Sequence, residues 1–302
     1  MLKTNKNKEH WNGWLLVDKT VGITSFQAIN RLKKLLNVKV GHCGTLDPFA
    51  SGCLVVALGK ATKLINYAMP FKKNYTFSVK WGVSTDSDDL TGKVIETSNI
   101  IPTKEQILNT IKCFVGKIDQ VPPIFSAVKV NGKKAYEYAR RGEKLVLKAK
   151  EVHLLECSLL SHKDHYSTFN IITGKGFYVR SLARDLAISL KTFAHVVELR
   201  RNQSHAFQNI EMINAETIKE SLHNNQLYDY ISSRILPLDY VLDDIPVHNL
   251  DLNNVLKIKN GQTINNQKVL FKNDSIVAIK HDKELIGLCT YLNGCLKPTK
   301  IF

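Results

Sequence analysis

The sequence contains both stretches with helical periodicity and stretches that resemble β-strands, and their order along the chain limits which folds are possible. Apolar residues follow a helical period over 24–36 and 176–190, and 103–114 is a third helical stretch. Strand-like stretches occur at 14–17, 53–58, 75–83, 93–96 and 167–173. Because helices and strands do not alternate strictly, the order predicts an α+β fold with a mixed sheet rather than repeated βαβ units.

Local signals refine this prediction. Thr24, followed by Gln27 three residues later, indicates a capping box at the start of the first helix. The acidic stretch 84–92 is typical of the turn of a hairpin between 75–83 and 93–96. After Leu238 the pattern changes to short strands broken by turns. We therefore expect two domains, a larger one over residues 1–238 and a small β-rich module over 239–302.

The chain is strongly basic, with a formal net charge of +15 and an isoelectric point near 9.4. Such a charge favours a polyanionic partner, either nucleic acid or an anionic membrane surface. A lysine-rich proteome would give the same excess. Hydrophobic residues make up 44% of the chain and charged residues 23%, which excludes a disordered protein.

The same sequence favours a reduced, cytoplasmic protein. The first ten residues are polar and basic, and no apolar run approaches the ~18 residues of a membrane span. The six cysteines include no CxxC pair, so we expect free thiols and no zinc site of the usual spacing. The acidic residues at 86–89 lack the ligand pattern of an EF-hand, and no metal site is predicted.

The basic charge is concentrated in residues 124–150. Only Glu137 and Glu143 oppose the eight basic residues Lys129, Lys133, Lys134, Arg140, Arg141, Lys144, Lys148 and Lys150. Basic side chains bind phosphates, and the interleaved aromatic residues offer flat faces for unpaired bases. A solvated surface with aromatic residues in the core is the alternative. With no helix-turn-helix or zinc finger, the segment favours RNA over DNA.

A loop over residues 41–52 contains three glycines and one proline and includes Asp47. A carboxylate in such a loop is either a catalytic group or a turn-forming aspartate, and the residues alone do not decide between them. Arg180 follows a glycine-rich turn near the start of a predicted helix. An arginine beside a carboxylate would lower its pKa and keep it ionised, but the spacing does not place Arg180 beside Asp47.

Six motifs in order resemble those of the bacterial TruB-type tRNA pseudouridine-55 synthases, and the resemblance covers nearly the whole chain. The matching stretches are 13–19 with 22–25, the loop 42–52, 73–75 leading to 81–89, 120–140, 176–182, and 199–201, with a weaker match at 297–302.

The resemblance implies a pseudouridine-synthase fold, with a mixed, largely antiparallel central sheet flanked by helices. It implies a PUA-like RNA-binding module at the C-terminus and a basic insertion at 124–150 that folds over RNA. It further implies that uridine 55 in the T-arm of tRNA is isomerised to pseudouridine without cofactor or metal. We expect a monomer.

The resemblance also assigns residues. It implies that Asp47 is the nucleophile, attacking either C6 of the base or C1′ of the ribose, that Tyr75 stacks on the flipped uracil, and that Arg180 pairs with Asp47. The predicted substrate-binding residues are His42, Tyr178, Leu199, Lys19, Lys129, Lys133, Arg140 and Arg141. For Tyr178 and Leu199, ordinary core packing is the alternative interpretation.

Two other functions stay open at this point. One is an RNA-binding or RNA-folding module that keeps the scaffold without the chemistry. The other is a synthase that acts on a different RNA uridine. The presence of Asp47, Tyr75 and Arg180 together favours catalysis, because a binding module has no need of all three.

Overall fold

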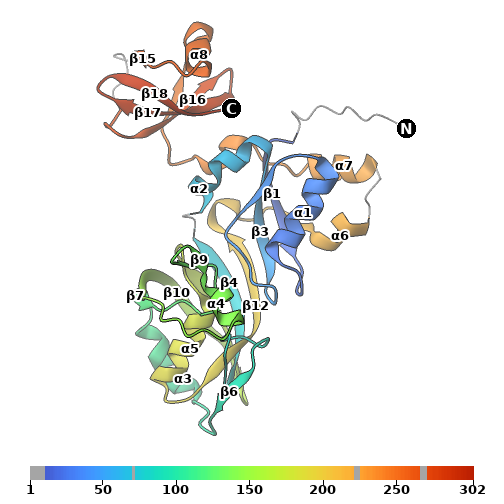
Figure 1. Cartoon of the computed structure of the whole chain (residues 1–302), viewed down its shortest axis with the longest axis vertical. Helices are drawn as coiled ribbons and strands as arrows, with labels where there is room; N and C mark the ends of the chain where they lie inside the picture. The colour runs from blue at the N-terminus through green and yellow to red at the C-terminus, as the bar shows by residue number, and fades with distance from the viewer. Residues whose placement is uncertain (1–10, 70–71, 221–224, 266–270) are drawn as a thin grey trace.

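The computed structural model describes residues 11–69, 72–220, 225–265 and 271–302. A twisted sheet of nine described strands runs through the larger part of the molecule (Figure 1). Its order is β13 (Ile213–Asn214), β1 (Gly13–Lys19), β3 (Ser51–Leu58), β12 (Ala194–Ser204), β4 (Lys73–Trp81), β11 (Tyr166–Thr173), β10 (Lys150–Lys163) and β7 (Gly116–Gln120), with β2 (Val40–Cys43) paired to β3. The pairs β1–β13 and β3–β12 are parallel and the others antiparallel, which confirms the mixed sheet.

Helices cover this sheet in two groups (Figure 1). The first group comprises α1 (Ser25–Leu36), α6 (Ala215–Glu220) and α7 (Asn225–Ser232), and the second α3 (Lys104–Lys112) and α5 (Val179–Ser189). Capping boxes at Thr24 and Thr103 begin α1 and α3, because each hydroxyl accepts from the backbone N–H three residues on. The predicted helices are thus confirmed. Between β3 and β4 lie η2 (Gly59–Leu64) and α2 (Ile65–Ala68).

The C-terminal residues form a separate five-stranded sheet in the order β14 (Val247–Asn249), β16 (Ile276–His281), β17 (Glu284–Leu292), β18 (Cys295–Ile301) and β15 (Ile264–Asn265). Helix α8 (Leu252–Lys259) packs against it, and Val255 and Ile258 enter its apolar core. A second cluster joins this module to the larger part, since Leu285 and Leu288 pack with Trp14 and Phe207. The short helix η3 (His205–Phe207) lies between β12 and β13, and η4 (Leu238–Val241) lies on the chain that leads to β14. The domain boundary at 238/239 stays a prediction.

One predicted hairpin is wrong in its pairing. The strand expected at 75–83 splits at Gly82, where φ is +83°. Its first part, β4, lies between β11 and β12, whereas β5 (Val83–Thr85) pairs with β6 (Val94–Thr97) in a small sheet of its own. A side chain at Gly82 would lie 2.6 Å from the Ser98 carbonyl oxygen, so only glycine permits this bend.

The basic segment 124–150 forms a small projection. It contains a hairpin of β8 (Lys129–Val130) and β9 (Lys133–Lys134), followed by α4 (Ala135–Arg140). Asn131 and Gly132 both have positive φ, as the two-residue turn between these strands requires. Apart from Lys150, which begins β10, the segment therefore presents short elements to solvent and does not add to the main sheet.

Candidate active site

Residues of helix α1, of strand β1 and of the turn between them hold the loop that carries Asp47. Ser25, the first residue of α1, accepts from the Leu46 N–H at 2.9 Å and donates to the Leu46 carbonyl at 3.0 Å. The Pro48 carbonyl accepts from the Gly22 N–H at 2.8 Å and from the Lys19 ammonium at 3.3 Å. These bonds fix the backbone on both sides of Asp47.

Strand β12 holds the two ends of the same loop through Arg201. Its Nη2 donates to the Gly44 carbonyl at 3.1 Å, and its Nε donates to the Cys53 carbonyl at 2.6 Å. Gly52 is required here, because its φ is +101° and a Cβ would lie 2.2 Å from the Arg201 carbonyl oxygen. The close approach of β3 to β12 therefore fixes where the loop ends.

Arg180 meets Asp47 directly. Its Nε lies 2.9 Å from Asp47 Oδ2, and the Arg180 side chain is only 4% exposed against 34% for Asp47. The same guanidinium donates to the carbonyls of Ser87 and Phe125, both at 3.0 Å, and lies 3.4 Å from Asp89 Oδ2. Arg180 thus joins the Asp47 loop to the acidic turn and to the start of the basic segment.

Asp89 belongs to this network, although the sequence analysis assigned it no role. It is 4% exposed, and its Oδ1 accepts from Ser87 Oγ at 2.8 Å and from Thr91 N and Oγ1 at 2.9 and 2.6 Å. The acidic turn of the sequence is therefore partly internal. In the sequence, Asp89 stands in the motif 81–89 that follows the strand of Tyr75. No neighbouring residue indicates that its side chain faces Arg180.

Opposing effects act on the Asp47 carboxyl. Burial raises its pKa above the ordinary value, and Asp89 raises it further, while Arg180 and, to a smaller extent, Lys19 lower it. The net direction is upward. Arg180 does lower the pKa of Asp47, as expected, but burial raises that pKa by more.

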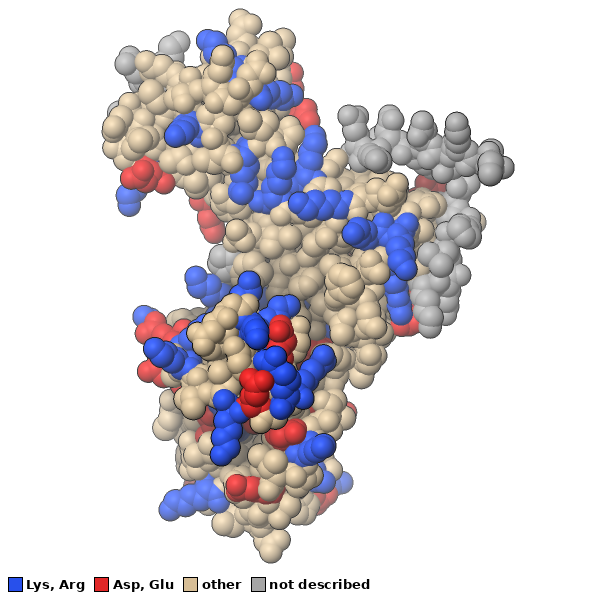
Figure 2. Space-filling model, viewed as in Figure 1, with Lys and Arg blue, Asp and Glu red and all other residues tan. Residues whose placement is uncertain are grey.

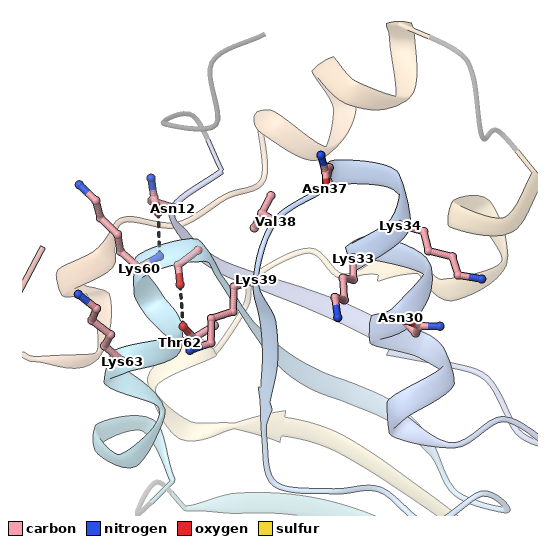
Figure 3. A pocket seen from close by; sticks show the side chains of 11 residues that line it. Asn12, Asn30, Lys33, Lys34, Asn37, Val38, Lys39, Lys60, Thr62 and Lys63 are labelled. Carbon is pink, nitrogen blue, oxygen red and sulfur yellow. Dashed lines mark hydrogen bonds between the residues drawn. The ribbon is translucent and has the colours of Figure 1, made fainter. Parts of the chain in front are cut away.

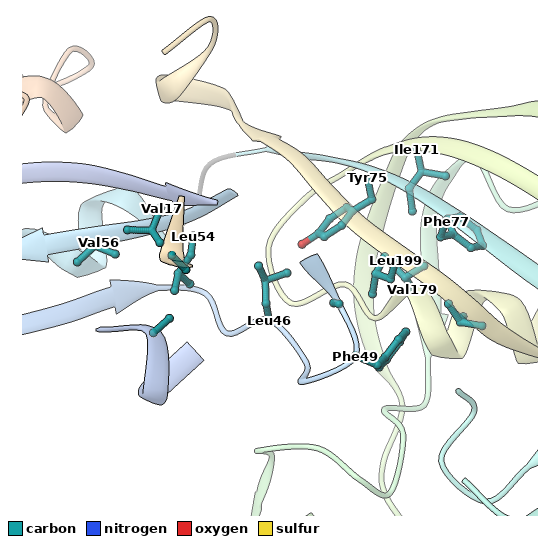
Figure 4. Packing of buried hydrophobic residues seen from close by; sticks show 14 of the residues in the cluster. Val17, Leu46, Phe49, Leu54, Val56, Tyr75, Phe77, Ile171, Val179 and Leu199 are labelled. Carbon is teal, nitrogen blue, oxygen red and sulfur yellow. The ribbon is translucent and has the colours of Figure 1, made fainter. Parts of the chain in front are cut away.

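Asp47 faces a cavity of about 260 Å³. Tyr75 from β4 and Leu199 from β12, which are 8% and 7% exposed, line it together with Tyr178 and Arg180. In Figure 4 the Tyr75 ring extends from its strand toward Leu46, with Leu199 beside it. The structure therefore brings Asp47, Tyr75, Arg180, Tyr178 and Leu199 around one hollow, large enough for a flat ring such as a base.

The comparisons with known proteins bear on this arrangement. The family model for TruB family pseudouridylate synthase (N terminal domain) matches residues 32–179, and that for tRNA pseudouridylate synthase B C-terminal domain matches 180–243. The tRNA pseudouridine synthase B of Ehrlichia chaffeensis is 40% identical over 296 residues, covering 96% of this chain and 99% of that protein. This chain belongs to the TruB family.

A second relative agrees in sequence, and two solved structures agree in fold. The tRNA pseudouridine synthase B of Rhodospirillum rubrum is 37% identical over 300 residues, covering 96% of both chains. A chain in the crystal structure of a Cbf5-Nop10-Gar1 complex matches 98% of this chain and 87% of its own length, with a TM-score of 0.71 and 24% identity. A chain of an archaeal Nop10-Cbf5 complex gives 0.72 over 98% and 88%. These likenesses confirm the pseudouridine-synthase fold, and the curled C-terminal sheet is consistent with a PUA-like module.

Two predicted substrate-binding residues of this TruB family member lie elsewhere. Lys19 is fully buried, and its ammonium donates to the carbonyls of Thr20, Ile23 and Pro48, so it holds the loop. Its contact with substrate stays a prediction. Burial lowers its pKa to about 8. His42 lies on β2 outside the lining of the cavity, and burial, with Arg201 nearby, lowers its pKa.

The predicted residues of the basic segment are exposed and lie apart from the Asp47 cavity. Lys129 and Lys133 stand on the β8–β9 hairpin, and Arg140 and Arg141 lie at the end of α4. Arg140 lies over the Tyr136 ring, 5.3 Å from its centre. Figure 2 shows lysine and arginine side chains gathered over this part of the surface, with acidic residues among them.

A second basic surface was not foreseen from the sequence. A hollow of about 890 Å³ lies between the end of α1 and η2, and the lysines that line it are Lys33, Lys34, Lys39, Lys60 and Lys63 (Figure 3). Lys63 also donates to the Ile301 carbonyl at the C-terminus and lies over the Phe302 ring. The five lysines are spread over residues 33–63, so only the fold gathers them.

Among the residues described, no group of three or more metal-binding side chains occurs, and no helix has the length and apolar character needed to cross a membrane.

Proposed function

We propose that this chain isomerises uridine 55 in the T-arm of tRNA to pseudouridine, with Asp47 as the nucleophile. The observation that carries this proposal is the Asp47 carboxylate, held 2.9 Å from Arg180 at the wall of a cavity lined by Tyr75. Membership of the TruB family supports a synthase, and the names of its relatives support tRNA as the substrate.

The reaction is an isomerisation without net redox change. The bond from ribose C1′ to N1 of uracil breaks, the base turns, and a bond from C1′ to C5 forms; C5 loses its hydrogen as a proton and N1 takes up a proton, so the atoms balance. Asp47 attacks either C6 of the base or C1′ of the ribose, and its carboxylate leaves again in a later step. The target base is stacked in folded RNA, so the nucleotide first flips into the cavity.

The neighbouring side chains support this chemistry. Arg180 orients the Asp47 carboxylate and stabilises its ionised form against burial. Tyr75 stacks on the flipped uracil and offers a hydroxyl for proton transfer, while Tyr178 and Leu199 enclose the base. A monomeric state stays a prediction. A cytoplasmic location stays a prediction.

Two basic surfaces provide the affinity for tRNA. The segment 124–150 begins beside the Asp47 cavity, since the Phe125 carbonyl accepts from Arg180, and its exposed cations Lys129, Lys133, Arg140 and Arg141 follow along the hairpin and helix. The lysine-lined hollow at η2 offers a second set of cations. Contacts to the phosphate backbone of this kind supply affinity without reading sequence.

The test is tritium release from a tRNA transcript labelled at C5 of uridine. Wild type and Asp47→Ala are compared with Asp119→Ala, which removes an exposed carboxylate on β7. We expect release by wild type and Asp119→Ala alone, and none from a transcript with cytidine at position 55. Equal release from that transcript would assign a different uridine. Tight tRNA binding without release by any variant would indicate a binding module.

A further inference from the structure

We propose that the hydroxyl of Ser126 donates a hydrogen bond to a carbonyl oxygen, O2 or O4, of the uracil that enters the Asp47 cavity. The inference rests on the proposed function, because it needs a uridine in that cavity. It gives the basic segment 124–150, to which Ser126 belongs, a part in the reaction as well as in binding the phosphate backbone.

Ser126 is the point at which the basic segment meets the cavity. It lines the cavity together with Ala127, and it is 5% exposed. The carbonyl of the preceding residue, Phe125, accepts from Arg180 Nη2 at 3.0 Å, and Arg180 Nε lies 2.9 Å from Asp47 Oδ2. One guanidinium therefore fixes both the Asp47 carboxylate and the backbone next to Ser126.

Two further hydrogen bonds fix the backbone of Ser126 itself. Its N–H donates to the Ile124 carbonyl at 3.0 Å, and its carbonyl accepts from the N–H of Tyr136, on helix α4, at 3.1 Å. Both backbone polar groups of Ser126 therefore have partners, and its side-chain hydroxyl is left for another bond. A group held in this way loses little conformational freedom when it binds a ligand.

The Ser126 hydroxyl is buried and has no hydrogen-bond partner in the protein. Among the described residues that line the cavity, no other side-chain nitrogen or oxygen is both buried and unpartnered. Tyr178, which also lines the cavity, is influenced by this hydroxyl, since burial raises the pKa of Tyr178 and Ser126 lowers it, but the two hydroxyls form no hydrogen bond. A buried hydroxyl without a partner costs free energy, and a polar group of the substrate removes that cost.

A uracil carbonyl is the partner that the chemistry favours. The cavity walls of Tyr75, Tyr178 and Leu199 fit a flat ring, and a buried uracil has two carbonyl oxygens that need donors. The reaction also places negative charge on these oxygens. Attack at C6 moves an electron pair toward O4, and loss of the base from C1′ spreads the charge of N1 onto O2 and O4. A donor directed at this developing charge lowers the barrier by either route.

The experiment uses full-length protein in excess over T-arm stem-loop RNAs whose target base is uridine, 2-thiouridine or 4-thiouridine, each tritiated at C5. Sulfur accepts hydrogen bonds more weakly than oxygen, so each thio base removes one acceptor. Single-turnover tritium release is measured with wild type, Ser126→Ala and Ser275→Ala. The last variant is the matched control, because Ser275 also has a buried hydroxyl without a partner but lies in the C-terminal module.

With uridine, we expect wild type to react about tenfold faster than Ser126→Ala, the size of one hydrogen bond to a group that becomes charged. With one of the two thio bases this ratio falls to within about twofold, because the acceptor of the Ser126 hydroxyl is then missing for both proteins. With the other thio base the ratio stays about tenfold, so the pair identifies the carbonyl. Ser275→Ala follows wild type with all three RNAs.

The proposal is overturned if Ser126→Ala reacts within about twofold of wild type on the uridine RNA. It is also overturned if the ratio is the same on all three RNAs, which would mean that the hydroxyl supports only the fold of the site. A thermal unfolding curve for each variant separates misfolding from loss of a contact, and Ser126→Gly, which also lacks the hydroxyl, decides the case if Ser126→Ala does not fold. Failure of wild type to release tritium from the uridine RNA would instead contradict the proposed function.

Discussion

The loop of Asp47 and the basic segment 124–150 are both irregular and contain glycines, but they differ in how firmly the rest of the protein holds them. Bonds from Ser25, Lys19 and Arg201 hold the backbone of the first. The second is a small hairpin and one short helix with exposed cations. Attack on a specific atom needs a group fixed to within a fraction of an ångström, whereas phosphate contacts tolerate movement.

The two regions are nevertheless connected at the base of the basic segment. Arg180 donates to the Phe125 carbonyl, and on the same helix Ser181 and Arg184 donate to the Val121 carbonyl at 2.7 and 2.8 Å. Gln120 also forms two hydrogen bonds with the backbone of Tyr178. Helix α5 therefore fixes where the exposed segment begins while its tip remains in solvent.

The largest expected effect comes from removing the charge that orients Asp47. Arg180→Met should lower kcat by about 10²–10³-fold, because one preorganised contact to the reacting group is lost. Affinity for tRNA should change by less than about tenfold, since the basic segment remains. Tritium release and filter binding measure the two quantities. Arg184→Met, on the same helix but bonded to Asp88 at 3.0 Å, is the matched control. A parallel loss of binding and turnover in Arg180→Met would argue against a separation of the two regions.

Substitution of one glycine in each region compares how much each contributes to the free energy of unfolding. Gly52→Ala should destabilise the fold by about 3 kcal/mol or more, because positive φ and a 2.2 Å contact with the Arg201 carbonyl act together. Gly132→Ala also has positive φ, at +81°, but nothing lies within 4 Å of a Cβ there. We expect a loss of about 1–2 kcal/mol at this position, the cost of the left-handed conformation alone. Urea unfolding gives the free energy of unfolding of both variants. Equal losses would mean that the Asp47 loop is no more constrained than the hairpin.

The acid side of the pH profile tests the environment of Asp47. Burial raises its pKa, so the carboxylate becomes protonated, and the nucleophile is lost, at a higher pH than for an ordinary aspartate of about 3.9. We expect kcat to fall as pH decreases through a value above that figure. Tritium release at saturating RNA over a pH series, with circular dichroism to confirm folding, gives the profile. A limb at or below the ordinary value would show that Arg180 outweighs burial.

The smallest expected effects lie in the basic segment. Lys133→Ala and Arg140→Ala should each weaken tRNA binding by a few-fold and lower the salt dependence by about one counterion per lost phosphate contact. The value of kcat should not change, because neither side chain lines the cavity. Binding isotherms at several salt concentrations measure this, with exposed Lys112→Ala on α3 as the control. An unchanged salt slope would remove the segment from the RNA interface.

The sequence by itself determined the elements that local rules govern. The capping box at Thr24 and the apolar period of 24–36 and 176–190 depend on residues three or four positions apart, and they predicted α1 and α5. The helical stretch 103–114 likewise predicted α3, whose capping box at Thr103 the structure shows. The ordered motifs gave the family, and with it the set Asp47, Tyr75 and Arg180. These three residues do line one cavity.

Only the tertiary structure decided which partners meet across the sheet. The pairing of β4 with β11 and β12, the burial of Lys19, and the contact of Asp89 with Arg180 all join residues that local spacing does not connect. The same holds for the five lysines at η2 and for Ser126 at the wall of the Asp47 cavity. Periodicity and capping act within one or two turns of chain, whereas these contacts depend on strand order, which is set by the packing of the whole core.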